Sequence, residues 1–197
     1  MVEVSERKSL LRRAVLDRRQ ALDAYDLAVA ARGLRDVLLM TPEVLTARCV
    51  ATYVSIGREP GTGPLLEALR KRGVVVLLPV LLADGDLDWV AYEGPHALAP
   101  AARGLLEPVG DALGVDAVLE ADVVLVPGVA VDPTGMRLGR GGGSYDRVLT
   151  RVLARRARPP LTCVLLHDGE VLDTALPREP HDAHVAAVAT PSGLQRF

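Results

Sequence analysis

Short apolar runs that alternate with helical patterns constrain the fold of this chain more than any other feature of its sequence. The runs have the length and valine-rich composition of buried strands and cover residues 49–54, 74–80, 87–92, 123–126 and 162–166. Helical spacing of apolar residues covers residues 25–39, 64–71 and 144–155. This alternation predicts an α/β fold with a largely parallel or mixed central sheet flanked by helices. The turn Asp84-Gly85-Asp86 predicts a hairpin, which would attach an antiparallel pair.

No linker, internal repeat or low-complexity tract interrupts the sequence, so we expect residues 1–197 to form one domain. The longest apolar run, residues 74–83, is too short to span a bilayer and contains Pro79. The charged N-terminus lacks the apolar segment of a secretory signal, and we expect a cytoplasmic protein without membrane contact. Cys49 and Cys163 lie in apolar runs and are expected to be core residues in a reducing compartment.

A basic segment near the N-terminus is predicted to form a helix. Ser5 is a plausible N-cap, and Leu11, Val15 and Leu22 follow at helical spacing. Lys8 and Arg12 are four residues apart, which places both side chains on one face, where they could bind one phosphate chain. Charge patterning alone favours a solvated basic face instead. The net charge of −2 and the lack of interleaved aromatic residues give no reason to expect a nucleic-acid partner.

Residues 135–147 combine consecutive glycines with arginines, between an apolar run and a predicted helix. Three glycines in succession, residues 141–143, allow successive backbone N–H groups to turn toward one anion. Arg137 and Arg140 add positive charge, and the helix that begins near Ser144 would direct its N-terminus at the same point. The segment fits neither a Walker A loop nor a Rossmann fingerprint. It predicts a phosphate site, with an ordinary flexible surface loop as the alternative.

The chain resembles the 5-formyltetrahydrofolate cyclo-ligase family, also called methenyltetrahydrofolate synthetases. The specific match is the run Asp122-Val-Val-Leu-Val-Pro-Gly-Val-Ala-Val-Asp132 followed by Gly135-x-Arg137-Leu-Gly-Arg-Gly-Gly-Gly-x-Tyr-Asp-Arg147. Weaker correspondences extend over nearly the full length in the expected order: Lys8-x-x-x-Arg12, Tyr53-x-Ser55 with Glu59 and Thr62, Pro79, Gly104-x-x-Glu107-Pro108, His181-Asp182 and Ala189-Thr190-Pro191.

The resemblance implies an ATP- and magnesium-dependent enzyme that acts on a small molecule, with no obligate protein partner. In such an enzyme the formyl oxygen of 5-formyltetrahydrofolate is phosphorylated, and N10 of the same folate attacks the activated carbon. The products would be 5,10-methenyltetrahydrofolate, ADP and phosphate. Phosphoryl transfer of this kind depends on positioning and charge neutralisation, and it needs no covalent nucleophile from the protein.

The same resemblance assigns roles to residues of this sequence. It implies that the catalytic residues are Arg12, Arg140 and Tyr145. It implies nucleotide contacts from Lys8, Arg12, Arg137, Gly139, Arg140, Gly141, Gly142, Gly143, Ser144 and Tyr145. It implies folate contacts from Tyr53, Glu59, Arg140, Gly143, Ser144 and Tyr145. It implies that magnesium is held by Asp146 and Asp182.

Several of these residues also have simpler interpretations. Asp146 can be a first-turn carboxylate that favours the helix dipole, and Glu59 can be an exposed loop residue. Trp89 and Tyr92 could border a flat ring or belong to the core. The sequence His181-Asp182-Ala183-His184 is only a weak signal for zinc, and His181 can instead orient Asp182.

Three positions depart from the usual pattern of the family, namely Pro60, Ser144 and Ala186. Ser144 stands where a tyrosine is common, which suggests weaker substrate fit or turnover. A folate- or nucleotide-binding protein without catalytic activity is therefore an alternative. A sugar-phosphate isomerase or transferase that uses the glycines for its substrate phosphate is a more distant one.

Overall fold

A computed structural model describes residues 2–155 and 159–197. Their centre is a seven-stranded sheet in the order β11-β10-β9-β6-β1-β2-β3. The five inner strands are parallel, and the two edge strands, β3 and β11, pair antiparallel with their neighbours. The strands are β1 (Cys49–Ala51), β2 (Val75–Leu81), β3 (Leu87–Ala91), β6 (Val123–Pro127), β9 (Leu161–Leu165), β10 (Ala187–Thr190) and β11 (Gly193–Arg196). The expected mixed α/β sheet is confirmed.

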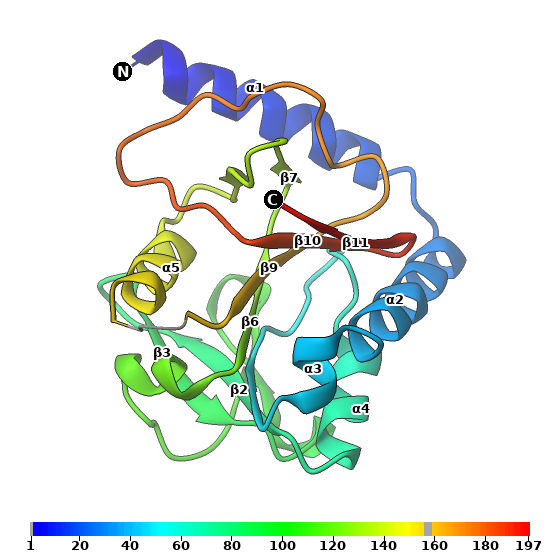
Figure 1. Ribbon diagram of the computed structural model, residues 1–197, viewed down its shortest axis with the longest axis vertical. Helices are drawn as coiled ribbons and strands as arrows, with labels where there is room; N and C mark the ends of the chain where they lie inside the picture. Colours follow the sequence, from blue (N-terminus) through cyan, green and yellow to red (C-terminus); the bar gives the residue numbers. More distant parts are fainter. Residues whose placement is uncertain (1, 156–158) are drawn as a thin grey trace.

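Helices cover both faces of this sheet. The helices are α1 (Val2–Arg19), α2 (Ala24–Leu39), α3 (Pro42–Thr46), α4 (Gly63–Lys71) and α5 (Ser144–Arg155), with short 3-10 segments η1 (Pro95–Ala97), η2 (Ala102–Gly104) and η3 (Val115–Glu120). Figure 1 shows α2 and α4 on one side of the sheet and α5 on the other. Two small hairpins complete the fold: β4 (Leu98–Pro100) with β5 (Leu106–Pro108), and β7 (Ala130–Val131) with β8 (Arg137–Leu138).

The side chains of the inner strands alternate between two apolar clusters. Under α2 and α4, residues such as Leu38 and Leu69 pack on Leu125. Under α5, Val148 and Val152 pack in a second cluster. Strands that are buried on both faces read as continuous apolar runs, which explains the valine-rich pattern of the sequence. Each fully buried valine or leucine contributes roughly 1.5–3 kcal/mol to stability.

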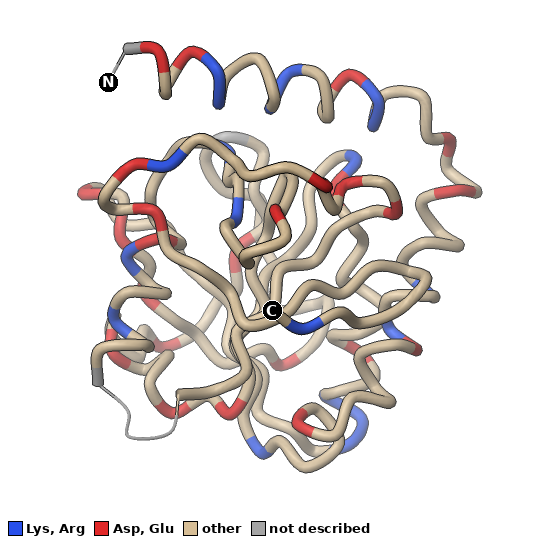
Figure 2. Tube along the Cα trace, turned by 45° about the horizontal axis from the view of Figure 1, so that its top comes forward, with Lys and Arg blue, Asp and Glu red and all other residues tan. Residues whose placement is uncertain are grey.

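Helix α1 lies across the end of the sheet, over the loops that follow the strands (Figure 1). Basic and acidic residues are distributed along its length (Figure 2). Its Val15 packs in a small cluster with Met136, Leu138 and Leu176. The expected N-cap at Ser5 is wrong because the helix already begins at Val2, with no glycine or proline upstream of Ser5 to stop it.

Of two further predictions about local structure, the hairpin is confirmed and the length of the first strand is wrong. The hairpin at Asp84-Gly85-Asp86 is confirmed, and Gly85 adopts a φ of 81°, which a side chain would strain. The run at residues 49–54 forms a shorter strand than expected, since Tyr53 and the residue after it leave the ladder and reach the site described below. No helix in the described part of the chain combines the length and apolarity that a membrane span requires.

Candidate active site

A cavity of about 300 Å³ lies beyond the carboxyl ends of the central strands. The chain leaves β1 and β6 in opposite directions along the sheet, toward β2 and β9, so these two strands flank a topological switch point. Ligands of open α/β sheets bind at such points. We call this space the inner cavity; it is lined by Tyr53, Val54, Ile56, Glu59, Pro79, Leu81, Leu87, Leu105, Leu106, Glu107, Pro127, Gly128, Arg137, Gly139, Arg140, Gly141, Gly142, Gly143, Ser144, Tyr145 and Asp146.

A second, more open depression of about 1080 Å³ adjoins the cavity, and we call it the outer groove. It is lined by Gly141, Gly142, Gly143, Asp146, Arg147, Thr150, Arg151, Leu153, Ala154, Pro180, His181, Asp182, Ala183 and His184. Residues 141–143 and Asp146 therefore form a wall that is common to both spaces. Two ligands bound on either side of this wall would meet at the glycines.

The glycine loop, residues 139–143, has a conformation that explains its composition. Gly141 and Gly143 adopt φ values of 99° and 72°, which residues with a Cβ rarely adopt. A Cβ on Gly139 would lie 2.7 Å from Nη1 of Arg137, so the loop packs directly on that guanidinium. The loop leads into α5 at Ser144, as the sequence predicts, and the N-terminus of this helix faces the shared wall.

Helix α1 brings Arg12 to the glycine loop and Lys8 to Asp182 of the outer groove, although neither cation lines the cavity or the groove itself. Nε of Arg12 donates to the carbonyl oxygen of Gly139 at 2.7 Å. Nζ of Lys8 lies 2.7 Å from Glu179 and 2.5 Å from Asp182, and Lys8 is only 4% exposed. Burial disfavours the ammonium, but the hydrogen bonds from Lys8 to Asp182 and Glu179 outweigh it and raise the pKa of Lys8. A solvated basic face is thus wrong for Lys8.

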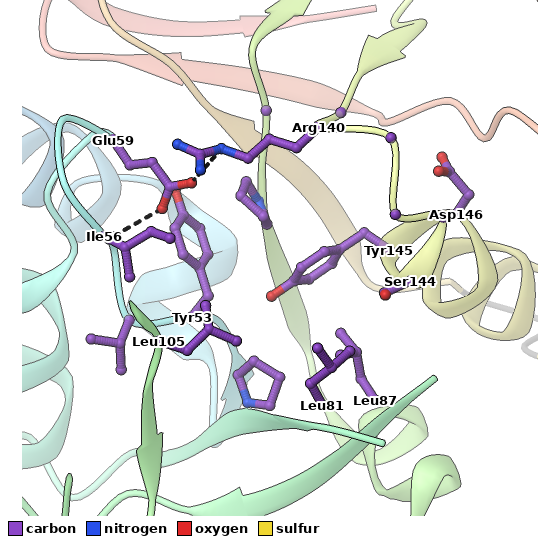
Figure 3. A pocket seen from close by; sticks show the side chains of 18 of the residues that line it. Tyr53, Ile56, Glu59, Leu81, Leu87, Leu105, Arg140, Ser144, Tyr145 and Asp146 are labelled. Carbon is purple, nitrogen blue, oxygen red and sulfur yellow. Dashed lines mark hydrogen bonds and ion pairs between the residues drawn. The ribbon is translucent and has the colours of Figure 1, made fainter. Parts of the chain in front are cut away.

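The two arginines of the motif occupy different environments. Arg137 is buried; its Nη1 donates to the carbonyl of Pro127 at 3.0 Å, and its Nη2 donates to Asp146 at 2.8 Å. Arg140 is about half exposed, and its Nε lies 3.2 Å from Oε1 of Glu59 (Figure 3). Arg137 is therefore held by two hydrogen bonds, whereas among the described residues the side chain of Arg140 is held by this one ion pair.

Glu59 is not an exposed loop residue, because it is 8% exposed and lines the inner cavity. Its Oε2 accepts the backbone N–H of Ile56 at 3.0 Å. Tyr53 and Tyr145 line the same cavity (Figure 3), and the hydroxyl of Tyr53 has no hydrogen-bond partner among the described residues. Burial, followed by the nearby Glu59 charge, raises the pKa of both phenols, so both stay protonated donors near neutral pH.

For Trp89 and Tyr92 the structure supports the core alternative over a position beside a bound ring. Trp89 is fully buried in the cluster under α5, and Tyr92 donates its hydroxyl to Glu67 of α4 at 2.8 Å. Neither residue lines the cavity or the groove. Burial removes the large apolar area of the indole from water, although Nε1 of Trp89 has no hydrogen-bond partner among the described residues. Ser144, one of the departures from the family pattern, donates its hydroxyl to the carbonyl of Gly85 at 2.6 Å and so ties α5 to the β2–β3 turn.

The carboxylates expected to hold magnesium, Asp146 and Asp182, both line the outer groove. Ligand atoms of Glu179, His181 and Asp182 lie within 4.8 Å of one another, which adds one carboxylate that sequence reasoning missed. Carboxylate oxygens such as these are ligands that suit magnesium. His181 is exposed, and its Nε2 lies 4.0 Å from Asp182.

The sequence analysis did not predict that Leu105 and Leu106 line the inner cavity, because no pattern in the sequence marks these residues.

Comparisons with known proteins agree with this geometry. The sequence model that describes the 5-formyltetrahydrofolate cyclo-ligase family matches residues 4–191 of this chain. The 5-formyltetrahydrofolate cyclo-ligase of Mycolicibacterium smegmatis is 39% identical over 189 residues, which are 93% of this chain and 93% of that protein. The Escherichia coli K12 protein of the same name is 33% identical and covers 90% and 97%. The NMR structure of Aquifex aeolicus 5,10-methenyltetrahydrofolate synthetase gives a TM-score of 0.80 at 29% identity, over 96% of this chain and 92% of that chain.

Proposed function

The chain belongs to the 5-formyltetrahydrofolate cyclo-ligase family, and from this premise we propose that it converts 5-formyltetrahydrofolate to 5,10-methenyltetrahydrofolate with ATP and magnesium. The observation that carries the proposal is the wall shared by the two spaces, residues 141–143 with Asp146. A phosphoryl group must pass between two substrates in this reaction, and the shared wall would let both substrates approach the same glycines.

We assign the pterin and its formyl group to the inner cavity. Its lining is mostly apolar, and its volume lies at the lower end of the range for ligand sites, which suits a bicyclic head group. The carboxylate of Glu59 can accept hydrogen bonds from the aminopyrimidinone edge. The phenols of Tyr53 and Tyr145 are protonated donors that can contact the substrate, and Gly143 and Ser144 close the cavity on the side of the groove.

We assign the triphosphate to the glycine loop and to the cations around it. Backbone N–H groups of the loop and the N-terminus of α5 favour anions, and Lys8, Arg12, Arg137 and Arg140 supply positive charge. Asp146 and Asp182 would hold a magnesium ion, which would neutralise part of the negative charge of the triphosphate. The residues fit such an ion because both carboxylates line the groove beside the loop.

The reaction then needs positioning and charge stabilisation from the protein, without a covalent nucleophile. The formyl oxygen attacks the γ-phosphorus and ADP leaves. N10 next attacks the formyl carbon and the ring closes. The bond from that carbon to the phosphorylated oxygen then breaks, and phosphate leaves with the proton that N10 gives up. Arg12 and Arg140 would stabilise the charge on the transferred group, and Tyr145 would orient the formyl group. In-line positioning of this kind can supply roughly 7–11 kcal/mol of the barrier.

The proposal is tested by incubating the purified protein with 5-formyltetrahydrofolate, magnesium and ATP while following the absorbance of the methenyl product. Product that forms only with ATP is the expected result. Binding of folate or ATP without product would favour the non-catalytic alternative. Ala186, one reason to consider that alternative, lines neither the cavity nor the groove, so its substitution does not touch the proposed site.

A further inference from the structure

One ion pair joins the two halves of the proposed site. Nε of Arg140, on the glycine loop, lies 3.2 Å from Oε1 of Glu59, on the loop that follows β1 (Figure 3). In the function proposed above, Glu59 binds the pterin and Arg140 binds the transferred phosphate. Each residue therefore contacts the other through a group that its own proposed ligand would also use, Oε1 of Glu59 and the guanidinium of Arg140.

Glu59 has little free capacity in this arrangement. Its Oε2 accepts the N–H of Ile56 at 3.0 Å, and its Oε1 faces Arg140. An aminopyrimidinone edge presents two adjacent N–H donors, which need both oxygens of a carboxylate at good geometry. Bidentate binding of such an edge would bring a second donor to Oε1, the oxygen that already faces Arg140, and would weaken the ion pair.

The side chain of Arg140 can move once the folate has displaced it from Glu59. Its side chain is 49% exposed, while the side chain of Glu59 is 8% exposed. The loop that carries Arg140 lines both the cavity and the groove, so a guanidinium released from Glu59 remains beside the phosphate site. The ion pairs of Lys8 with Asp182 and of Arg137 with Asp146 differ from this one, because both of their members are assigned to the nucleotide side.

We propose that Glu59 positions Arg140 according to folate occupancy: without folate it holds Arg140 away from the phosphates, and folate binding releases Arg140 to the nucleotide. This inference rests on the function proposed above. Because coupling between sites is reciprocal, nucleotide must favour folate by the same factor. A single additional charged interaction with the nucleotide, in a partly exposed site, should make this factor at least about five.

The experiment measures the dissociation constant of the β,γ-imido analogue of ATP with magnesium, with and without saturating 5-formyltetrahydrofolate. The wild-type protein should bind the analogue at least about fivefold more tightly with folate. Glu59→Gln should bind the analogue at least about fivefold more tightly than wild type without folate, because Arg140 is already free. A general loss of structure would weaken binding, so this increase in affinity cannot come from misfolding.

A matched control separates the ion pair from a simple change of charge. Glu107→Gln removes a carboxylate from the same cavity wall, but Glu107 accepts a hydrogen bond from the N–H of Leu81 and forms no ion pair with Arg140. Its analogue affinity should stay within about twofold of wild type. The inference is overturned if folate leaves wild-type analogue binding unchanged, or if the affinity of both variants rises equally. Either result is compatible with ATP-dependent product, whereas the absence of product would count against the proposed function itself.

Discussion

Carboxylates neutralise three of the four side chains proposed to bind phosphate. Lys8 contacts Glu179 and Asp182, Arg137 contacts Asp146, and Arg140 contacts Glu59. Without these carboxylates the cations of the site would repel one another, and a buried charge without a partner lowers the stability of the fold. Magnesium and triphosphate together offer the same groups new partners, since the metal takes carboxylates and the phosphates take cations. Binding of the proposed ligands would therefore exchange the observed ion pairs for contacts with the metal and the phosphates.

Arg140→Ala should reduce kcat/KM at least about tenfold, because it removes a charge-assisted contact to the transferred phosphate. Arg140→Lys keeps the charge but loses the planar donor geometry, and we expect an intermediate rate. Steady-state assays of methenyl product, with ATP and folate varied in turn, measure both changes. Wild-type rates in the alanine variant would remove Arg140 from the catalytic assignment.

Asp146→Asn should raise the magnesium concentration that gives half-maximal activity, because an amide is a weaker ligand than a carboxylate. The same change leaves the buried guanidinium of Arg137 without its ionic partner, so the protein should also lose stability. A magnesium titration of activity and a urea unfolding curve separate the two effects. A variant with lower stability and an unchanged magnesium titration would limit Asp146 to holding Arg137.

At the scale of elements, the sequence predicted the inner strands other than β10, the β2–β3 hairpin, α5 and the glycine loop, because each has a local signal. Apolar runs, turn residues and glycine clusters act within a few residues of themselves. Contacts between distant segments leave no such signal. Lys8 meets Glu179 across 171 positions, and the segment around Glu179 has no periodicity that would place it there. Trp89 lies on a strand as predicted, but its burial depends on packing under α5.

Helix α1 carries Lys8 and Arg12, and a buried ion pair fixes its C-terminal end. Arg19 is 2% exposed and contacts both oxygens of Glu170 at 2.7 Å, while it also donates to the carbonyl of Gly128 at 2.9 Å. Glu170 in turn accepts the N–H of His167. The position of the two cations at the glycine loop should therefore depend on this pair.

Glu170→Gln should destabilise the protein by about 3–5 kcal/mol, since it leaves the guanidinium of Arg19 buried without a counter-charge. Under conditions where the variant is folded, its KM for ATP should rise more than its KM for folate, because Lys8 and Arg12 of α1 are both assigned to the nucleotide in the proposed function. Urea unfolding and steady-state kinetics measure these effects. Glu43→Gln breaks the exposed pair with Arg196 and should cost no more than about 1 kcal/mol. Equal losses in the two variants would contradict a special role for the buried pair.

At the scale of the whole molecule, buried and paired carboxylates hold together segments that lie far apart in sequence. Asp132 is fully buried and accepts hydrogen bonds from the N–H and hydroxyl of Thr134 and from the N–H groups of Met136 and Leu176. Burial alone would raise the pKa of Asp132, but these hydrogen bonds outweigh it and lower the pKa below its ordinary value. The pKa values of Asp86, beside Arg151, and of Asp182, beside Lys8, are also lowered.

These shifts set the direction of the pH dependence of stability. A carboxyl group whose pKa is lower in the folded state stabilises the fold fully above its unfolded pKa of about 4, and this contribution is lost as the pH falls through the folded pKa. The free energy of unfolding should therefore change little from pH 7 to about 5 on account of these groups and then fall steadily toward about pH 3. Urea unfolding at a series of pH values measures this profile.

Asp132→Asn should lower the free energy of unfolding at pH 7 and weaken its dependence on pH. One amide oxygen cannot accept from Thr134, Met136 and Leu176 together, since Leu176 faces the second oxygen of the carboxylate, so the variant should be less stable at pH 7 by about 1–3 kcal/mol. The asparagine does not titrate, and the difference from wild type should shrink as the wild-type carboxyl group becomes protonated. A difference that stays constant from about pH 7 to about pH 3 would show that Asp132 keeps the same pKa in the folded and unfolded chains and acts through shape alone.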